Sequence, residues 1–192
     1  MKSINYVIVE LDQAYNNEVE LSTGDSLIVN STIESVSNIN REATVKSSPD
    51  FVILKEGDKV IVHHNIFRLR NGIDGNVVPS NFHIEGNLYF VPFTEIFMYK
   101  RGDNEWNALM PFCFVEPIVK EKKEGFDLSA AESTYKGRLH RRGIIKYPNE
   151  DLQAQGIQQD DTVLFTKNSE YEFEIDGKLY YKMSTRDIVG AI

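Results

Sequence analysis

The stretch "YEFEIDGKLYYKM", residues Tyr171–Met183, decides the fold class of this chain. Apolar and polar residues alternate on both sides of Asp176-Gly177, and an Asp-Gly pair between two alternating runs is a strong signal for a tight β-hairpin turn. Side chains of a strand alternate between the two faces of a sheet, so each run presents one apolar face. The stretch therefore predicts two antiparallel strands joined by a two-residue turn.

Strand signals of the same kind fill most of the remaining chain. The segments are short, apolar and rich in β-branched and aromatic residues, and no window shows a sustained helical period. Many short strands at close spacing are typical of β-barrels and β-sandwiches, so we predict an all-β protein. The segments are Asn5–Leu11, Asp50–Phe67, Gly86–Tyr99, Pro111–Val119, Arg142–Pro148, Asp160–Thr166 and Asp187–Ile192.

The segments occur twice in the same order. Each copy has an opening strand, a long polar stretch, a strand preceded by Asp, and a hairpin arm that ends in a Thr-containing turn and Ile. Each copy is too large for a solenoid repeat and suits a small barrel, so we predict a tandem duplication with a first barrel at residues 1–102, a linker at 103–110 and a second barrel at 111–192. The matching blocks are "YVIVEL" (6–11) with "CFVEPI" (113–118), "EGDKVIVHH" (56–64) with "QDDTVLFT" (159–166), and "EGNLYFVPFTEI" (85–96) with "DGKLYYKMSTRDI" (176–188).

The composition excludes several classes of protein. The net charge is −8, which argues against nucleic-acid binding because phosphate contacts need clustered Lys and Arg. The single cysteine, Cys113, cannot form an intramolecular disulfide and suits a reducing compartment. No signal peptide opens the sequence and no apolar run is long enough for a membrane span, so we expect a cytoplasmic protein without a membrane partner.

No pattern of catalytic or metal-binding residues is visible. His63 and His64 are neighbours at a strand end and should point to opposite faces, which makes a poor metal pair. The chain has no cysteine pairs with zinc spacing, no glycine-rich dinucleotide fingerprint and no G-x-S-x-G elbow. We therefore expect no catalytic site, no metal and no cofactor.

The last 33 residues resemble a known family. "DDTVLFTKNSEYEFEIDGKLYYKMSTRDIVGAI" (Asp160–Ile192) resembles the C-terminal pattern of the GroES, or 10 kDa chaperonin, family. Upstream, "GFDLSAAESTYKGRLHRRG" (Gly125–Gly143) resembles the mobile loop of that family and the strand after it. The first half is similar only more loosely, through Tyr6–Leu11, Glu56–His64 and Glu85–Tyr99. The resemblance implies two tandem GroES-like small β-barrels.

The resemblance also implies a role for two polar loops. In the family, the loop after the first strand carries a short aliphatic segment that docks into an apolar groove of the chaperonin ring. In this chain Leu27, Ile28 and Val29 take that place in the first half, and Gly125, Phe126 and Leu128 take it in the second, where Asp127 interrupts the apolar run. The alternative is that "SLIVNS" (26–31) forms an ordinary edge strand of its own barrel.

Two features depart from the family pattern. Family members often have a second hairpin that roofs the dome, and the connections Lys46–Glu56 and Lys146–Gln159 are short for one. The segment Arg68–Gly86 is an insertion of unassigned purpose. The diverged sequence, the absence of a transit peptide and the connections too short for a roof favour a phage-encoded version, which would act in the host cytoplasm, over a plastid tandem version.

The function that the resemblance implies is that of a co-chaperonin. The chain would form a homo-oligomeric ring, for example of three or four copies, that caps a GroEL-like chaperonin and assists protein folding without an ATPase of its own. The alternative is a non-chaperone structural or assembly protein, such as a virion component, that uses the barrels as a scaffold.

Overall fold

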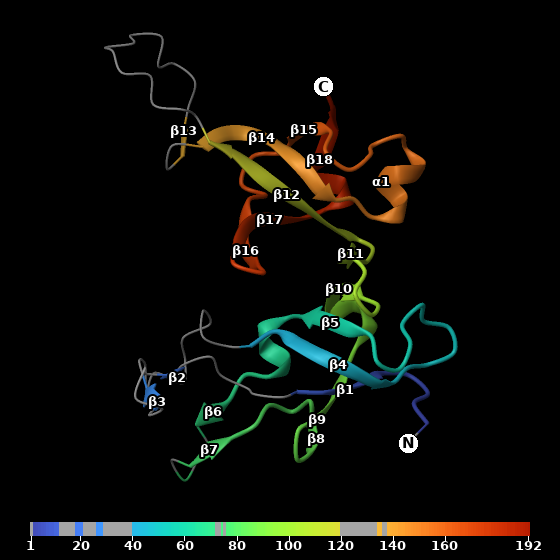
Figure 1. Cartoon of the computed structure of the whole chain (residues 1–192), viewed down its shortest axis with the longest axis vertical. Helices are drawn as coiled ribbons and strands as arrows, with labels where there is room; N and C mark the ends of the chain where they lie inside the picture. Colours follow the sequence, from blue (N-terminus) through green and yellow to red (C-terminus); the bar gives the residue numbers. More distant parts are fainter. Residues whose placement is uncertain are drawn as a thin grey trace. The chain divides into compact units, whose positions relative to one another are not determined.

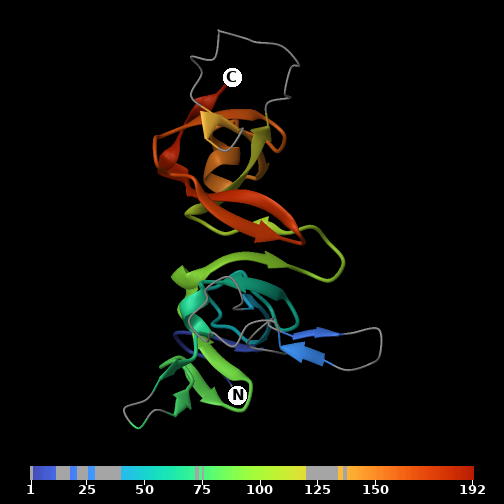
Figure 2. The ribbon, with the colours of Figure 1, turned by 90° about the vertical axis from the view of Figure 1, so that its left-hand side faces the viewer.

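The computed structural model describes residues 2–11, 18–20, 26–28, 40–71, 74, 76–119, 134–135 and 138–192. The chain divides into two compact units, Met1–Trp106 and Asn107–Ile192. The division falls inside the segment 103–110 for which the sequence predicts a linker. Figures 1 and 2 show the strands of both units in the colours of the sequence.

Strands dominate the first unit, as the sequence predicts. Within this unit the large sheet has the strand order β10-β5-β4-β1-β9-β8, and two small hairpins, β2–β3 and β6–β7, accompany it. The strands are β1 (Val7–Glu10), β2 (Glu18–Glu20), β3 (Ser26–Ile28), β4 (Glu42–Ser47), β5 (Lys59–Val62), β6 (Arg70–Asn71), β7 (Val77–Val78), β8 (His83–Glu85), β9 (Leu88–Val91) and β10 (Ile96–Lys100). Two 3₁₀ turns, η2 (His64–Ile66) and η3 (Phe93–Glu95), follow β5 and β9.

The second unit is also built on one large sheet. The strand order is β16-β17-β12-β14-β15-β18, and β13 pairs with β14 beside this path. The elements are β11 (Asn107–Ala108), β12 (Phe112–Val119), β13 (Thr134–Tyr135), β14 (Arg138–Tyr147), α1 (Glu150–Ala154), β15 (Thr162–Phe165), β16 (Tyr171–Ile175), β17 (Lys178–Ser184), η4 (Thr185–Asp187) and β18 (Ile188–Ala191). The predicted Asp-Gly hairpin joins β16 to β17, and both Asp176 and Gly177 have the positive φ that such a turn requires.

The two units share one topology. The order β10-β5-β4-β1-β9-β8 repeats as β18-β15-β14-β12-β17-β16, and the corresponding strand pairs are antiparallel. The register agrees as well, because Val9 lies opposite Val45 in the first unit and Val115 lies opposite Ile145 in the second. All four side chains are fully buried, so equivalent positions form the two cores.

An aspartate turn recurs at the same place in both units. Asp58 comes just before β5 and Asp161 just before β15, and each carboxylate accepts a hydrogen bond from the backbone N–H three residues earlier. Each aspartate carbonyl also accepts a bond from the neighbouring strand, which fixes the turn to that strand. The donors are Lys55 N–H (2.8 Å) and Val45 N–H (2.8 Å) for Asp58, and Gln158 N–H (2.8 Å) and Ile145 N–H (2.9 Å) for Asp161.

A cross-strand ion pair also recurs. Lys46 Nζ lies 2.6 Å from Glu10 on β4 and β1, and Lys146 Nζ lies 3.5 Å from Glu116 on β14 and β12. Partly exposed pairs of this kind contribute little to stability. Their value here is that they mark the same two positions in both units.

The structure differs from the sequence-based expectation at one connection. Residues 148–161 contain the short helix α1, although no helical period predicts one. Asn149 explains it, because its Oδ1 accepts from Leu152 N–H (3.0 Å) while its Nδ2 donates to Phe112 O (2.9 Å) and Thr185 Oγ1 (2.7 Å). Five residues are too few to produce a periodic signal, so the cap and the burial of Leu152 hold the helix.

The connections that would carry a roof contain no hairpin. Residues 48–58 between β4 and β5 and residues 148–161 between β14 and β15 are fully described, and neither contains a strand. The strand pairs among the described residues give open sheets, without a pair that closes either sheet on itself.

An ion pair between a buried aspartate and an exposed arginine distinguishes the first unit from the second. Arg101 Nε and Nη2 lie 2.8 and 2.7 Å from the two carboxylate oxygens of Asp58, whose side chain is 2% exposed. Burial alone would raise the pKa of Asp58, but the hydrogen bonds from Arg101 and from Lys55 N–H outweigh it and hold the pKa below its ordinary value. Asp58 therefore stays charged, and the arginine compensates that charge.

Replacing Gly143 tests the close approach of β14 to β12. A Cβ at this position would lie 2.3 Å from Val115 Cγ1 and 2.7 Å from Glu116 O, so Gly143→Ala should push the two strands apart. We expect a loss of about 1–3 kcal/mol in the free energy of unfolding, measured by urea denaturation. Gly190→Ala in β18 is the matched control, because its Cβ would meet nothing within 4 Å. Equal losses in the two variants would contradict the packing described here.

Replacing Arg101 by Met tests the ion pair through its pH dependence. A folded-state pKa below 3.8 means that the contribution of Asp58 is present at higher pH and is lost as the pH falls through the folded value. The variant should melt several degrees lower than the wild type near neutral pH, and the difference should shrink below about pH 4. A difference that stays constant down to acid denaturation would show that Arg101 acts through packing alone.

Candidate functional site

The two loops singled out by the sequence connect equivalent strands. β1 pairs with β4, so the segment 11–41 leaves and re-enters the sheet at neighbouring strands. β12 pairs with β14, with Val119 opposite Arg138, so the segment 120–137 does the same in the second unit. Because β1 and β4 correspond to β12 and β14, the two loops occupy the same place in the shared topology.

Buried and hydrogen-bonded residues hold both ends of the first loop. Leu11, at its start, is 2% exposed, and its N–H donates to Asn87 O (3.0 Å). At its end, Asn40 Oδ1 accepts from Glu42 N–H (2.9 Å), and Arg41 O accepts from Val62 N–H (2.9 Å). The segment between these residues thus starts and ends at fixed points of the sheet.

Side-chain contacts hold the returning end of the second loop. Arg138 Nη1 lies 2.8 Å from Glu172 Oε1 and 3.5 Å from the Tyr181 hydroxyl, and His140 Nδ1 lies 3.4 Å from Glu170. The hydrogen bond to Tyr181 raises the pKa of Arg138. Desolvation lowers it, but the hydrogen bond to Glu172 adds to the upward shift, so the pKa lies above its ordinary value. The first residue of β14 is therefore a permanent cation tied to β16 and β17.

Two of the six proposed docking residues lie in a described strand. Leu27 and Ile28 belong to β3, where they pair with Val19 and Glu18 of β2. Among the strands that the structure describes, β3 pairs with β2 and not with the large sheet of the first unit, so it is no edge strand of that sheet. Val29, Gly125, Phe126 and Leu128 lie outside the described residues.

The two loops differ in charge, a contrast that the motif comparison did not detect. The first loop, residues 12–39, contains only acidic charged residues, whereas the second, residues 120–137, contains as many lysines as acidic residues. A simple count of charges along each loop would have found this. The charged residues are Asp12, Glu18, Glu20, Asp25 and Glu34 in the first loop, and Lys120, Glu121, Lys122, Lys123, Glu124, Asp127, Glu132 and Lys136 in the second.

The adjacent histidines are arranged differently from the sequence-based expectation. The rings of His63 and His64 do not point apart but stack, with centroids 4.2 Å apart. The reason is that β5 ends at Val62 and the 3₁₀ turn η2 begins at His64, so strand alternation no longer applies. Burial, and then the charges of His63, Arg41 and Arg68, lower the pKa of His64 to about 4, so its ring is neutral near pH 7.

Other possible reactive groups in the described part of the chain are few. No group of three or more His, Cys, Asp or Glu side chains among the described residues could hold a metal ion. Cys113 is fully buried in β12, and burial, with a smaller effect of Asp187, raises the pKa of its thiol to about 12. Its thiol therefore stays protonated and packs as part of the core. No helix within the described ranges has the length and apolar character needed to cross a bilayer.

Comparison with known proteins finds one family. The sequence model of the family described as Chaperonin 10 Kd subunit matches residues 128–192. The matched segment contains β13 to β18 and thus most of the second sheet, whereas the first unit lies outside it. No curated protein matches the chain. The second unit is therefore similar to the Chaperonin 10 Kd subunit over about a third of the whole sequence.

Proposed function

We propose that the chain is a co-chaperonin that caps a GroEL-like chaperonin ring and assists protein folding. The match of residues 128–192 to the Chaperonin 10 Kd subunit carries this proposal. The shared strand order supports extending it to the first unit, because an unmatched sequence with the same topology and the same aspartate turn is readily explained by duplication. The chain would then hold two GroES-like small β-barrels in tandem.

The two loops are the docking elements in this proposal. Both loops start and end at equivalent strands of the two sheets, which supports giving them the same role. Leu27, Ile28 and Val29 in the first loop and Phe126 and Leu128 in the second would enter an apolar groove of the partner. Three aliphatic side chains provide at most several kcal/mol before the cost of ordering the loop, so a single loop binds weakly.

A ring converts this weak contact into firm binding. Once the first loop of an assembly has bound, the remaining loops are held near their sites at a high effective concentration. Each single contact is weak, so the cap can still dissociate loop by loop. A homo-oligomer of three or four chains would present six or eight loops. The exposed edge of β18 supports self-association, because Val189 and Ile192 are 61% and 66% exposed beside an edge that pairs only with β15 among the described strands.

The remaining properties follow from this role. The protein would have no catalytic activity of its own and would act in the cytoplasm, which is the host cytoplasm if a phage encodes it. The absence of a hairpin in the fully described connections 48–58 and 148–161 supports a cap without a roof. The competing function is a structural or assembly protein, such as a virion component, in which the loops need not bind a chaperonin.

Co-sedimentation with a chaperonin tests the proposal. The wild-type protein should sediment with a GroEL-like ring in the presence of ATP and not in its absence. Replacing Leu27, Ile28 and Val29 together by Ser should abolish this binding, because the loss is multiplied over every copy in the ring. The melting temperature should change little, because a docking segment makes no contact with the core.

Two controls separate binding from folding. Ser31-Thr32→Ala-Ala changes the same loop without removing apolar side chains and should leave both binding and melting temperature unchanged. If the triple Ser variant unfolds, Leu27–Val29 are core residues. Replacing a buried aliphatic side chain by Ser would cost about several kcal/mol of stability at each of the three positions. If the wild-type protein does not sediment with the chaperonin either with or without ATP, the co-chaperonin function is wrong and the scaffold function replaces it.

The exposed edge of β18 yields a separate prediction about assembly. Removing Asp187–Ile192 should convert an oligomer into monomers or aggregates, but it also removes Ile188, which packs against the core. Val189→Lys is the sharper change, because it places a charge on the edge and leaves the core intact. Light scattering should report a smaller mass for this variant, whereas Val77→Lys in β7 should keep the wild-type mass. An unchanged mass for Val189→Lys would exclude β18 from the interface.

A further inference from the structure

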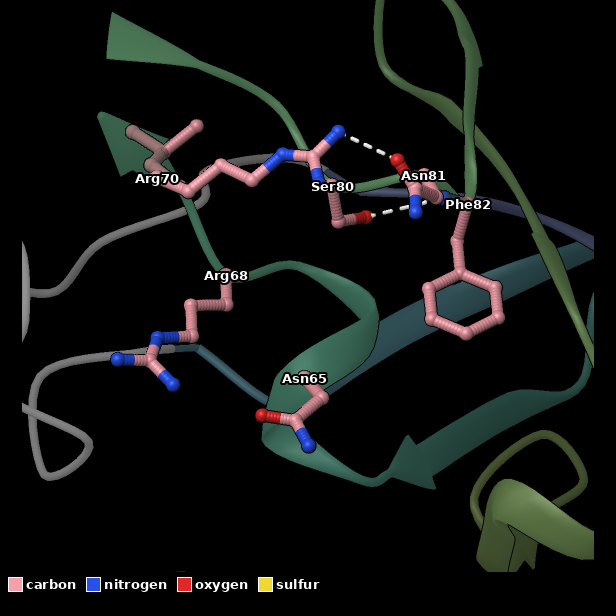
Figure 3. Close-up of a pocket in the computed structure, with 7 residues that line it drawn as sticks. Asn65, Arg68, Arg70, Ser80, Asn81 and Phe82 are labelled. Carbon is pink, nitrogen blue, oxygen red and sulfur yellow. Dashed lines mark hydrogen bonds between the residues drawn. The ribbon is translucent and has the colours of Figure 1, made fainter. Parts of the chain in front are cut away.

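The connection between β5 and β8 encloses a pocket in the first unit. It spans residues 63–82, whereas residues 166–170 connect the equivalent strands β15 and β16, so the shared strand order does not require its length. The pocket has a volume of about 420 Å³, within the range of small-molecule sites, and residues of the segments 65–70 and 80–82 line it (Figure 3). None of the described residues that line it is acidic, although the net charge of the chain is −8.

Arg70 is the cationic group whose position in this pocket is fixed. The pairing of β6 with β7 sets its backbone opposite Val78. Its Nη2 donates to Asn81 Oδ1, and Figure 3 shows the two side chains reaching toward each other. The guanidinium of Arg68 points away from this pair in the same view, so Arg70 alone is assigned to a ligand here.

The hydrogen bond between Arg70 and Asn81 leaves donors for a ligand. Because Asn81 Oδ1 accepts from Arg70, the Nδ2 end of the amide faces the other way, and this nitrogen can only donate. A guanidinium carries five N–H groups, and this bond uses one of them. Among the described residues, neither Asn81 Nδ2 nor the other N–H groups of Arg70 have a further partner. The pair therefore presents hydrogen-bond donors beside a permanent positive charge.

A second set of contacts fixes the segment that carries Asn81 and Phe82. The Ser80 hydroxyl donates to Ile66 O (2.5 Å) and accepts from Phe82 N–H (3.2 Å), which ties the segment before β8 to η2. The Phe82 ring contacts Phe90 edge-on, with 5.5 Å between the ring centroids. Phe82 is half-buried and lines the pocket, so it adds an apolar wall beside the donors.

We propose that this pocket binds a small carboxylate joined to an apolar ring, with the carboxylate at Arg70 and Asn81 Nδ2 and the ring against Phe82. A carboxylate only accepts hydrogen bonds, so it matches these donors, and its bonds to a guanidinium are charge-assisted. One guanidinium compensates one negative charge, which favours a carboxylate over a doubly charged phosphate. The pocket lies outside the loops 12–39 and 120–137 of the proposed chaperonin contact, so the site stands whether or not the chain binds a chaperonin.

Titration of the ¹⁵N-labelled full chain, followed by amide chemical shifts, tests the proposal with four matched probes. Benzoate carries the ring and the carboxylate, acetate lacks the ring, benzamide lacks the charge, and phenyl phosphate replaces the carboxylate. Benzoate should saturate one site, with its shifts concentrated at residues 65–70 and 80–82. It should bind at least about tenfold more tightly than acetate or benzamide, and no more weakly than phenyl phosphate.

The same titration supplies the contradicting results. Benzamide binding as tight as that of benzoate, or tighter binding of phenyl phosphate, would overturn the carboxylate. Acetate binding as tight as that of benzoate would overturn the contact of the ring with Phe82. No saturation up to about 50 mM benzoate would overturn the site itself.

Matched variants locate the carboxylate within the pocket. Arg70→Ala should weaken benzoate at least about tenfold, whereas Arg68→Ala removes an equal charge that points elsewhere and should weaken it less than about threefold. Asn81→Asp keeps an acceptor for Arg70 but replaces the Nδ2 donor by a charged oxygen, so it should abolish binding. Phe82→Leu keeps an apolar side chain but removes the ring, so it should weaken benzoate and not acetate.

Melting temperatures separate these effects from unfolding. Arg68, Arg70 and Asn81 are exposed, so their variants should melt like the wild type. Equal losses of benzoate affinity in Arg70→Ala and Arg68→Ala would show that charge alone attracts the probe. That result, or wild-type affinity in the folded Asn81→Asp variant, would overturn the assignment to Arg70 and Asn81.

Discussion

Both sheets depend on one constraint, the aspartate turn in front of β5 and β15. The chain must reverse between two neighbouring antiparallel strands, and the N–H groups in the reversal would otherwise lose their hydrogen bonds. Asp58 and Asp161 satisfy them from within the turn, and their carbonyls accept from Val45 and Ile145 on the preceding strand. The residue before each aspartate, Gly57 or Asp160, takes the positive φ that tightens the turn. The register of β4 with β5, and of β14 with β15, follows from this arrangement.

The two units differ in the connections between their equivalent strands. The first unit compensates its turn aspartate with Arg101 and lengthens the connection from β5 to β8 into a pocket. In the second unit, the corresponding connection is limited to residues 166–170. This unit has its addition between β14 and β15, where Asn149 caps the helix α1. The loops also differ, since the first is acidic and the second is balanced in charge. One strand order with different additions gives the two units different surfaces.

Local sequence patterns predicted the strands, whereas contacts between residues far apart in the sequence determine the helix α1 and the pocket. The alternation around Asp176-Gly177 predicts the β16–β17 hairpin, because turn and strand chemistry both lie within a few residues. The repeated blocks likewise placed Tyr6–Leu11 and Cys113–Ile118 on the equivalent strands β1 and β12. The helix α1 depends on contacts of Asn149 with Phe112 and Thr185, far away in sequence, so no local pattern reports it. The pocket residues likewise come together only when the segments at 65–70 and 80–82 fold against each other.

Hydrogen–deuterium exchange with a GroEL-like ring tests the central claim most directly, because it reports which segments the partner covers. With the chaperonin and ATP present, the account predicts slower exchange for amides in residues 12–39 and 120–137. It predicts unchanged exchange in β4 and β14, which carry the sheets. Protection in only one loop would show that one unit docks and the other supports it. Unchanged exchange in both loops, with chaperonin and ATP present, would contradict the account.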